Sequence, residues 1–265
     1  MTELVFVGLG LNDDKGISVK GLEETRTADH VFMELYTSLM PEFNLDRFET
    51  SCGKKVRLVS RSELEEQNGA VILEAAQKGK TVFLVPGDPF IATTHITLRI
   101  EAQKLQIKTR IIHGTSIMSA IVSLSGLHNY KFGKTVTIPF LENFSETPYN
   151  VIAQNKQLGL HTLCLLDLKA VEKQFLSINQ ATKMLFDIER KRKMDIINPD
   201  QAAIGVARAG SDTPRLKADF LSVLADFDFG PPPHSLIIPG ELHFMEVESL
   251  IAFGSAPPAF RRLVR

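Results

Sequence analysis

The sequence contains little cysteine, with only Cys52 and Cys164 among its 265 residues. Two isolated cysteines match no zinc-binding spacing and are typical of a protein kept in a reducing compartment. We expect both to be small apolar residues of the core.

Neither sign of charge is in excess, since 30 Lys and Arg residues stand against 31 Asp and Glu residues. Bulk nucleic-acid binding usually requires a basic excess, so we expect no nucleic-acid partner, although a local basic patch is compatible with this composition. No run of about eighteen apolar residues exists, so no membrane span is expected. The opening MTELVFVGLGL lacks the basic and long apolar stretches of a signal peptide, and we expect a cytoplasmic protein.

What the sequence does have is a 44% share of hydrophobic residues, enough for one large or two medium domains. Up to residue 113 it alternates expected strands and helices. The strands are apolar throughout, which is typical of a parallel sheet covered on both faces. The expected strands are 4–10, 80–90 and 109–113, and the expected helices are 18–35, capped by Ser18, 61–79, capped by Ser62, and 93–106. Residues 30–36 are alternatively read as a second strand.

The second half has a different order of elements. Strands are expected at 134–140, 161–169, 201–211 and 235–240, and helices at 177–193 and 242–254. The fold class is therefore α/β, with an N-terminal domain of mostly parallel sheet (1–113) and a C-terminal domain of mixed sheet (114–265). Residues 114–133 are expected to form a linking helix and loop.

Three expected strands of the first half end in small or turn-forming residues. GLGL (8–11) resembles the start of a dinucleotide fingerprint, but Asp13 stands where the third glycine is needed, so it is either a tight strand exit or a close approach to a ligand. In PGDPFIATTH (86–95), Asp88 either forms the turn or binds a ligand. HGTSIMSA (113–120) opens a helix, whose N–H groups favour a polar ligand group. Three such exits predict a ligand site at the carboxyl edge of the sheet.

The second half supplies LLDLKA (165–170), ARAGS (207–211) and GPPPHSLIIPGELH (230–243). No Ser-His-Asp arrangement and no catalytic pair of carboxylates stands out. The spacing of His161, His234 and His243 matches no metal site, and we expect none.

These motifs, together with GLHNYKFGK (126–134) and in this order, resemble the diphthine synthase family over nearly the whole chain. That family belongs to the tetrapyrrole-methylase-like class of S-adenosylmethionine methyltransferases. GxG and GDP alone indicate only the wider class, whereas ATTH, YKFGK and PPPHSLIIPG point to the diphthine branch.

The resemblance implies two α/β domains with S-adenosylmethionine in the cleft between them, yielding S-adenosylhomocysteine. It implies a homodimer that methylates the amine of a modified histidine on translation elongation factor 2. The compact length favours the archaeal form, which stops at a trimethylated amine. The loop expected at 139–150 would touch the protein substrate. Carried over residue by residue, the cofactor contacts would be Leu11, Asp88, Ile91, Ser116, Ile117, Leu166, Ala209 and His234.

Methyl transfer from a sulfonium needs mainly alignment and exclusion of water, which is consistent with the absence of an obvious acid–base constellation. The amine must be neutral to attack, but solvent can take up its proton, so the sequence identifies no general base. Two alternatives stay open at this point. One is a small-molecule methylase of the same fold, acting on a corrin or porphyrin; the other is a non-catalytic nucleotide-binding module.

Overall fold

The computed structural model describes residues 2–170 and 172–264. They form two compact units, which divide between Ser119 and Ala120. The division falls inside helix α6 (Ile117–Ser125). The expectation that residues 1–113 form a separate domain stays a prediction.

The first unit contains a parallel sheet of five strands in the order β3-β2-β4-β1-β5. Its strands are β1 (Glu3–Gly8), β2 (His30–Met33), β3 (Arg57–Leu58), β4 (Lys80–Val85) and β5 (Lys108–Ile112). Its complete helices are α1 (Val19–Arg26), α2 (Leu45–Cys52), α3 (Arg61–Glu65), α4 (Ala70–Lys78) and α5 (Ile96–Lys104).

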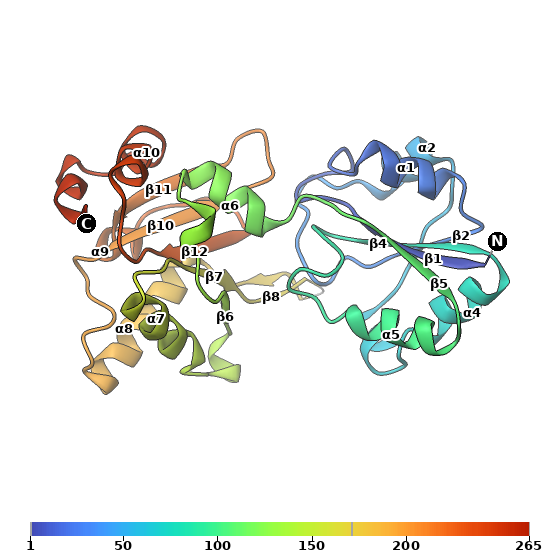
Figure 1. Cartoon of the computed structure of the whole chain (residues 1–265), viewed down its shortest axis with the longest axis horizontal. Helices are drawn as coiled ribbons and strands as arrows, with labels where there is room; N and C mark the ends of the chain where they lie inside the picture. Colours follow the sequence, from blue (N-terminus) through green and yellow to red (C-terminus); the bar gives the residue numbers. More distant parts are fainter. Residues whose placement is uncertain (1, 171, 265) are drawn as a thin grey trace. The chain divides into compact units, whose positions relative to one another are not determined.

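Helices cover both faces of this sheet, with α1 and α2 on one side and α4 and α5 on the other (Figure 1). Along β1, Leu4 and Phe6 pack toward α4 and α5, whereas Val5 and Val7 pack toward α1 and α2. Because successive side chains of a strand point to opposite faces, a strand covered on both sides must be apolar at every position. This confirms the expected doubly covered parallel sheet.

The second unit contains a mixed sheet in the order β11-β10-β12-β7-β6, in which only β6 and β7 are parallel among the described pairs. A separate two-stranded sheet pairs β8 with β9. The strands are β6 (Val136–Ile138), β7 (Thr162–Leu166), β8 (Leu168–Lys169), β9 (Gln174–Phe175), β10 (Ala202–Ala207), β11 (Arg215–Phe220) and β12 (His234–Ile238). The helices that lie wholly in this unit are α7 (Thr147–Gln157), α8 (Ile178–Arg192), α9 (Leu221–Leu224) and α10 (Phe244–Gly254), with 3-10 turns η1 (Asn129–Lys131), η2 (Leu141–Asn143) and η3 (Pro258–Leu263).

Three sequence expectations need correction. The helix expected over 18–35 ends at Arg26, and the alternative strand holds from His30, because residues 31–33 are all buried in the sheet. The helix expected over 61–79 is two helices, separated where Asn68 and Gly69 both adopt positive φ. The loop expected at 139–150 contains η2 and the start of α7.

The two cysteines are free and buried, as expected from their isolation in the sequence. Within the described residues, none of the helices is both long enough and apolar enough to cross a membrane.

Candidate functional site

The carboxyl edge of the parallel sheet is built from three glycines whose backbones touch. A Cβ on Gly8 would lie 2.5 Å from the carbonyl oxygen of Gly87 and 2.6 Å from the nitrogen of Gly114. A Cβ on Gly114 would lie 2.2 Å from the same carbonyl oxygen. No side chain tolerates such distances, so these glycines allow the exits of β1, β4 and β5 to converge.

Backbone hydrogen bonds tie two of these exits together. Gly10 donates to the Gly87 carbonyl at 3.2 Å, and Gly87 donates to the Gly10 carbonyl at 2.6 Å. The connection from β1 to β2 runs through α1 on one face of the sheet, and the connection from β4 to β5 runs through α5 on the other face. Adjacent strands whose connections lie on opposite faces mark the usual ligand edge of an open α/β sheet.

Asp88 follows this convergence and is buried, with 7% of its surface exposed. Its Oδ1 accepts a hydrogen bond from the Phe90 N–H at 3.1 Å, which shapes the turn. Its Oδ2 lies 2.8 Å from Nδ1 of His113, the residue after β5. The carboxylate therefore both forms the turn and orients an imidazole from another strand exit, a partner that the sequence did not indicate.

The other predicted contacts of the first unit lie around the same edge. Leu11 is within reach of Gly87, since its Cδ2 would be 3.9 Å from a Cβ there. Ser116 is buried and accepts a hydrogen bond from the Met118 N–H through Oγ, and Ile117 opens α6. Ile91 is 43% exposed on the loop after Asp88.

The predicted contacts of the second unit also gather at one sheet edge. The register pairs Ser235 with Leu165 and His234 with Ala207. Leu166 at the end of β7, His234 at the start of β12 and Ala209 just after β10 therefore share this edge. The sequence, in which these residues are far apart, gave no direct sign of this proximity.

Both ring nitrogens of His234 contact backbone groups of the same unit. Its Nε2 lies 3.0 Å from the Gly230 carbonyl, and its Nδ1 accepts from the Ile178 N–H at 3.4 Å. Burial lowers the pKa of His234, which favours the neutral ring that this pair of contacts requires. A cofactor contact at this position would therefore use the backbone.

Two features of the first unit fit the methyl donor that the resemblance implies. A Cβ on Gly87 would make only ordinary van der Waals contacts, at 3.9 Å to Leu11 Cδ2 and to the Thr115 carbonyl oxygen, so this exit is less crowded than those at Gly8 and Gly114. The buried carboxylate of Asp88 and the N–H groups opening α6 supply acceptors and donors for hydroxyl, amine and carboxylate groups.

A second buried pair supports the loop that carries Asp88 and Ile91. His95 ends this loop, is 3% exposed, and places Nε2 3.2 Å from Oε1 of Glu34, which follows β2. Glu34 is fully buried and also accepts hydrogen bonds from the Tyr36 and Thr37 N–H groups. The ATTH motif thus closes the loop against the neighbouring strand exit.

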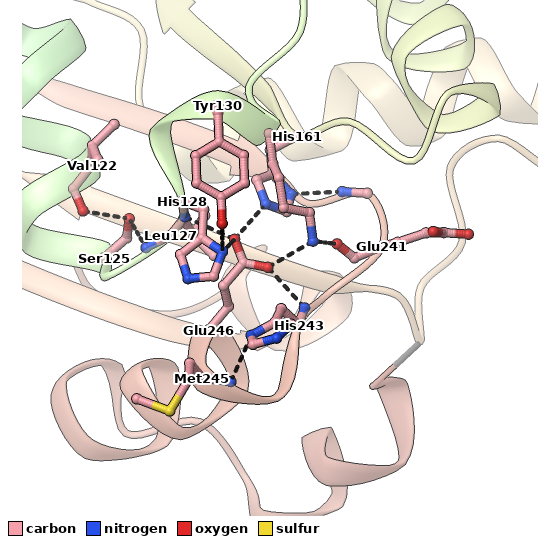
Figure 2. Close-up of polar contacts among 12 residues, drawn as sticks. Val122, Ser125, Leu127, His128, Tyr130, His161, Glu241, His243, Met245 and Glu246 are labelled. Atoms are coloured by element: carbon pink, nitrogen blue, oxygen red, sulfur yellow. Dashed lines mark hydrogen bonds and ion pairs between the residues drawn. The ribbon is translucent and has the colours of Figure 1, made fainter.

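The YKFGK and PGELH motifs meet at the opposite edge of the second unit's sheet. Figure 2 shows Glu246, which is fully buried, receiving hydrogen bonds from His161 and from the segments around residues 128–131 and 243. Burial works to raise the pKa of this carboxyl, but the hydrogen bonds from His161, Lys131 and two backbone N–H groups outweigh it and hold the pKa well below its ordinary value. This network joins three segments of the unit.

The comparisons with known proteins agree with this architecture. The family model described as Tetrapyrrole (Corrin/Porphyrin) Methylases matches residues 3–224. Diphthine synthase of Methanosarcina barkeri is 46% identical over 98% of this chain and 99% of its own length. Diphthine synthase of Methanocaldococcus jannaschii is 44% identical over 93% of this chain and 97% of its own length. A crystal structure of diphthine synthase superimposes with a TM-score of 0.89 at 43% identity, covering 98% of this chain and 99% of that one.

The convergent glycine exits and the family match define the class: the chain is a methyltransferase of the tetrapyrrole methylase family. Within that class, identity of this level over nearly the full length places it in the diphthine synthase family. The resemblance read from the motifs is thereby confirmed.

Proposed function

We propose that this protein uses S-adenosylmethionine to methylate elongation factor 2. The acceptor is the amine of the 3-amino-3-carboxypropyl group on a histidine of that factor, and successive transfers end at the trimethylated amine. The observation that carries the proposal is the similarity to diphthine synthases across 98% of the chain. A translation factor as substrate implies action in the cytoplasm.

The proposed cofactor contacts are the eight residues predicted from the sequence. In the first unit, Asp88 would accept hydrogen bonds from hydroxyl or amine groups, and the opening of α6 at Ser116 and Ile117 would bind a carboxylate. Leu11 and Ile91 would supply apolar contact. In the second unit, Leu166, Ala209 and His234 would contribute largely through their backbones. When bound, the cofactor supplies an activated methyl group on a positively charged sulfur.

The protein has to bind both reactants, align the amine and exclude water, while the proton that the amine loses passes to a base or to solvent. We further propose a homodimer, as the resemblance implies, with neither nucleic acid nor membrane as a partner.

The decisive experiment is methyl transfer to elongation factor 2, followed by mass spectrometry. We expect up to three added methyl groups on factor whose histidine carries the aminocarboxypropyl group, and none on unmodified factor. Methylation of the unmodified factor would refute the proposed specificity. Three added methyl groups without a methyl ester would support the archaeal type of activity.

Calorimetry tests the remaining alternatives. S-adenosylhomocysteine is expected to bind with a dissociation constant on the order of micromolar, while NAD and ATP should not bind. Absence of S-adenosylhomocysteine binding would contradict any methylase function. Turnover of a corrin or porphyrin, without turnover of the factor, would favour the small-molecule methylase.

A further inference from the structure

His113 and Asp88 form a hydrogen-bonded pair at the carboxyl edge of the parallel sheet. The distance from His113 Nδ1 to Asp88 Oδ2 is 2.8 Å. The two side chains differ sharply in exposure, since 8% of the aspartate and 75% of the histidine side chain are accessible. A buried carboxylate thus holds an imidazole that projects outward.

The hydrogen bond between the two side chains determines which ring nitrogen of His113 can accept a proton. A carboxylate only accepts hydrogen bonds, so Nδ1 of His113 carries the hydrogen. In the neutral imidazole, Nε2 then keeps its lone pair and can accept a proton. An aspartate that orients a histidine through Nδ1–H is a recurrent arrangement for a general base.

Asp88, on the loop after β4, is a charged group in contact with the His113 ring. The exit of β1 presents Gly8, and the chain toward α6 continues through Gly114. The predicted cofactor contacts Leu11 and Ser116 lie around the same sheet edge, so the exposed His113 side chain projects from the edge where the cofactor is proposed to bind.

We propose that His113 is the general base of the methyl transfer, held in its productive tautomer and orientation by Asp88. The inference rests on the proposed function, because it requires an amine as the methyl acceptor. It assigns a residue and a role that the sequence analysis left open.

The proton step balances without any further reactant. Near neutral pH the acceptor amine is an ammonium and has no lone pair for attack. Its N–H bond breaks, the electron pair stays on nitrogen, and the proton bonds to Nε2 of His113. The imidazolium then loses this proton to water through its exposed face. Every added methyl group again leaves a cationic nitrogen, so the step recurs before each following transfer.

The test compares His113→Gln with the wild type in single-turnover methylation of aminocarboxypropyl-modified factor at saturating cofactor. We expect the rate at pH 7 to fall about 100-fold, the typical contribution of a positioned base. The affinity for S-adenosylhomocysteine, measured by calorimetry, should stay within about twofold, a small change on the binding scale. His30→Gln is the matched control, since His30 is an exposed histidine at the other end of the same sheet and should not alter the rate.

Two further measurements separate a base from a merely structural residue. Added imidazole, or a pH high enough for solvent to deprotonate the amine, should restore much of the His113→Gln rate. The ¹⁵N spectrum of the neutral His113 ring in the free wild-type protein should show a hydrogen on Nδ1 and none on Nε2.

Several results would overturn the inference. They are a full rate in His113→Gln, a loss of S-adenosylhomocysteine affinity as large as the loss of rate, failure of both forms of rescue, or a hydrogen on Nε2 of the neutral ring. Failure of the wild type to methylate the modified factor would instead refute the proposed function, and this inference with it.

Discussion

Replacing Glu246 by glutamine should strongly destabilise the second unit. The carboxylate is fully buried and accepts four hydrogen bonds. The donors are the His128 N–H at 2.8 Å, the His243 N–H at 2.8 Å, His161 Nε2 at 2.9 Å and Lys131 Nζ at 2.9 Å. Each oxygen serves two donors, so either orientation of a glutamine amide turns its NH₂ group toward two of them.

The expected loss follows from these contacts. Removing the charge of a buried ion pair while its partners stay in place destabilises a protein by about 3–5 kcal/mol. A unit of this size loses about 2–4 °C of melting temperature per kcal/mol, so the second unit should melt about 6–20 °C lower. Thermal unfolding of the whole chain, followed by circular dichroism and calorimetry, measures this shift.

The pH dependence supplies an independent check. Because the pKa of Glu246 is lowered in the folded state, its contribution to the free energy of unfolding is fully present above the ordinary value of 4.5. That contribution is lost as the pH falls toward the folded pKa. The stability difference between wild type and Glu246→Gln should therefore be constant near neutral pH and shrink on acidification below about 4.5.

Glu248→Gln is the matched control on the same helix. Glu248 pairs with Arg261 at the surface, where both side chains are about half exposed, and such pairs contribute little to stability. A Glu246→Gln protein that melts together with the Glu248→Gln protein would refute the reasoning. So would a stability difference that does not depend on pH.

Three further predictions concern other parts of the molecule. Gly114→Ala should destabilise the first unit by about 1–3 kcal/mol, because its Cβ would meet the Gly87 carbonyl; an unchanged melting temperature would contradict this. Asp88→Ala should weaken S-adenosylhomocysteine binding about tenfold, as loss of one polar contact does, with circular dichroism unchanged; equal affinity by calorimetry would refute its role. Burial opposes ionisation of Glu189, but hydrogen bonds from Tyr149 and three backbone N–H groups lower its pKa to about 2. Its contribution to stability should thus be lost between about pH 4.5 and 2, and Glu189→Gln should flatten acid unfolding there.

Strands β1, β4 and β5 of the first unit could be predicted because their residues carry a local signal, whereas β2 was only an alternative and the two-residue strand β3 was not predicted. Apolar runs closed by Gly8, Gly87 and Gly114 mark strands and exits without knowledge of their neighbours. Helices α2 and α7 were not predicted, although each has a helix-start signal in its sequence. Asn44 caps α2 through its side chain, and Pro148 stands in the first turn of α7.

The expectation of one helix over residues 61–79, capped by Ser62, was wrong about both the cap and the length of the helix. The true cap is Ser60, which forms a reciprocal capping box with Glu63, and the expected Ser62 lies inside the helix. Asn68 and Gly69 then break the helix with positive φ, although the sequence there has no proline. A short polar interruption of this kind is hard to distinguish from the exposed face of one longer helix.

The site was only partly predictable because its partners are distant in sequence. Asp88 stood out as a carboxylate at a strand end, but His113 lies 25 residues further on and follows a strand that does not adjoin β4. The buried pair of Glu34 and His95 is separated by 61 residues. Only the strand order brings such residues together, and a single sequence contains no direct record of that order.

The strand order also indicates a second role for Gly8, the first residue of GLGL (8–11). β4 and β5 lie on either side of β1, so Asp88 and His113 must meet across the exit of β1. A side chain at residue 8 would collide with the backbone of both flanking exits, at Gly87 and at Gly114. The glycines therefore do more than admit a ligand, because they bring β4 and β5 close enough for the carboxylate to orient the imidazole. It follows that Gly8→Ala should separate this pair and impair methyl transfer even where the proposed cofactor contacts survive.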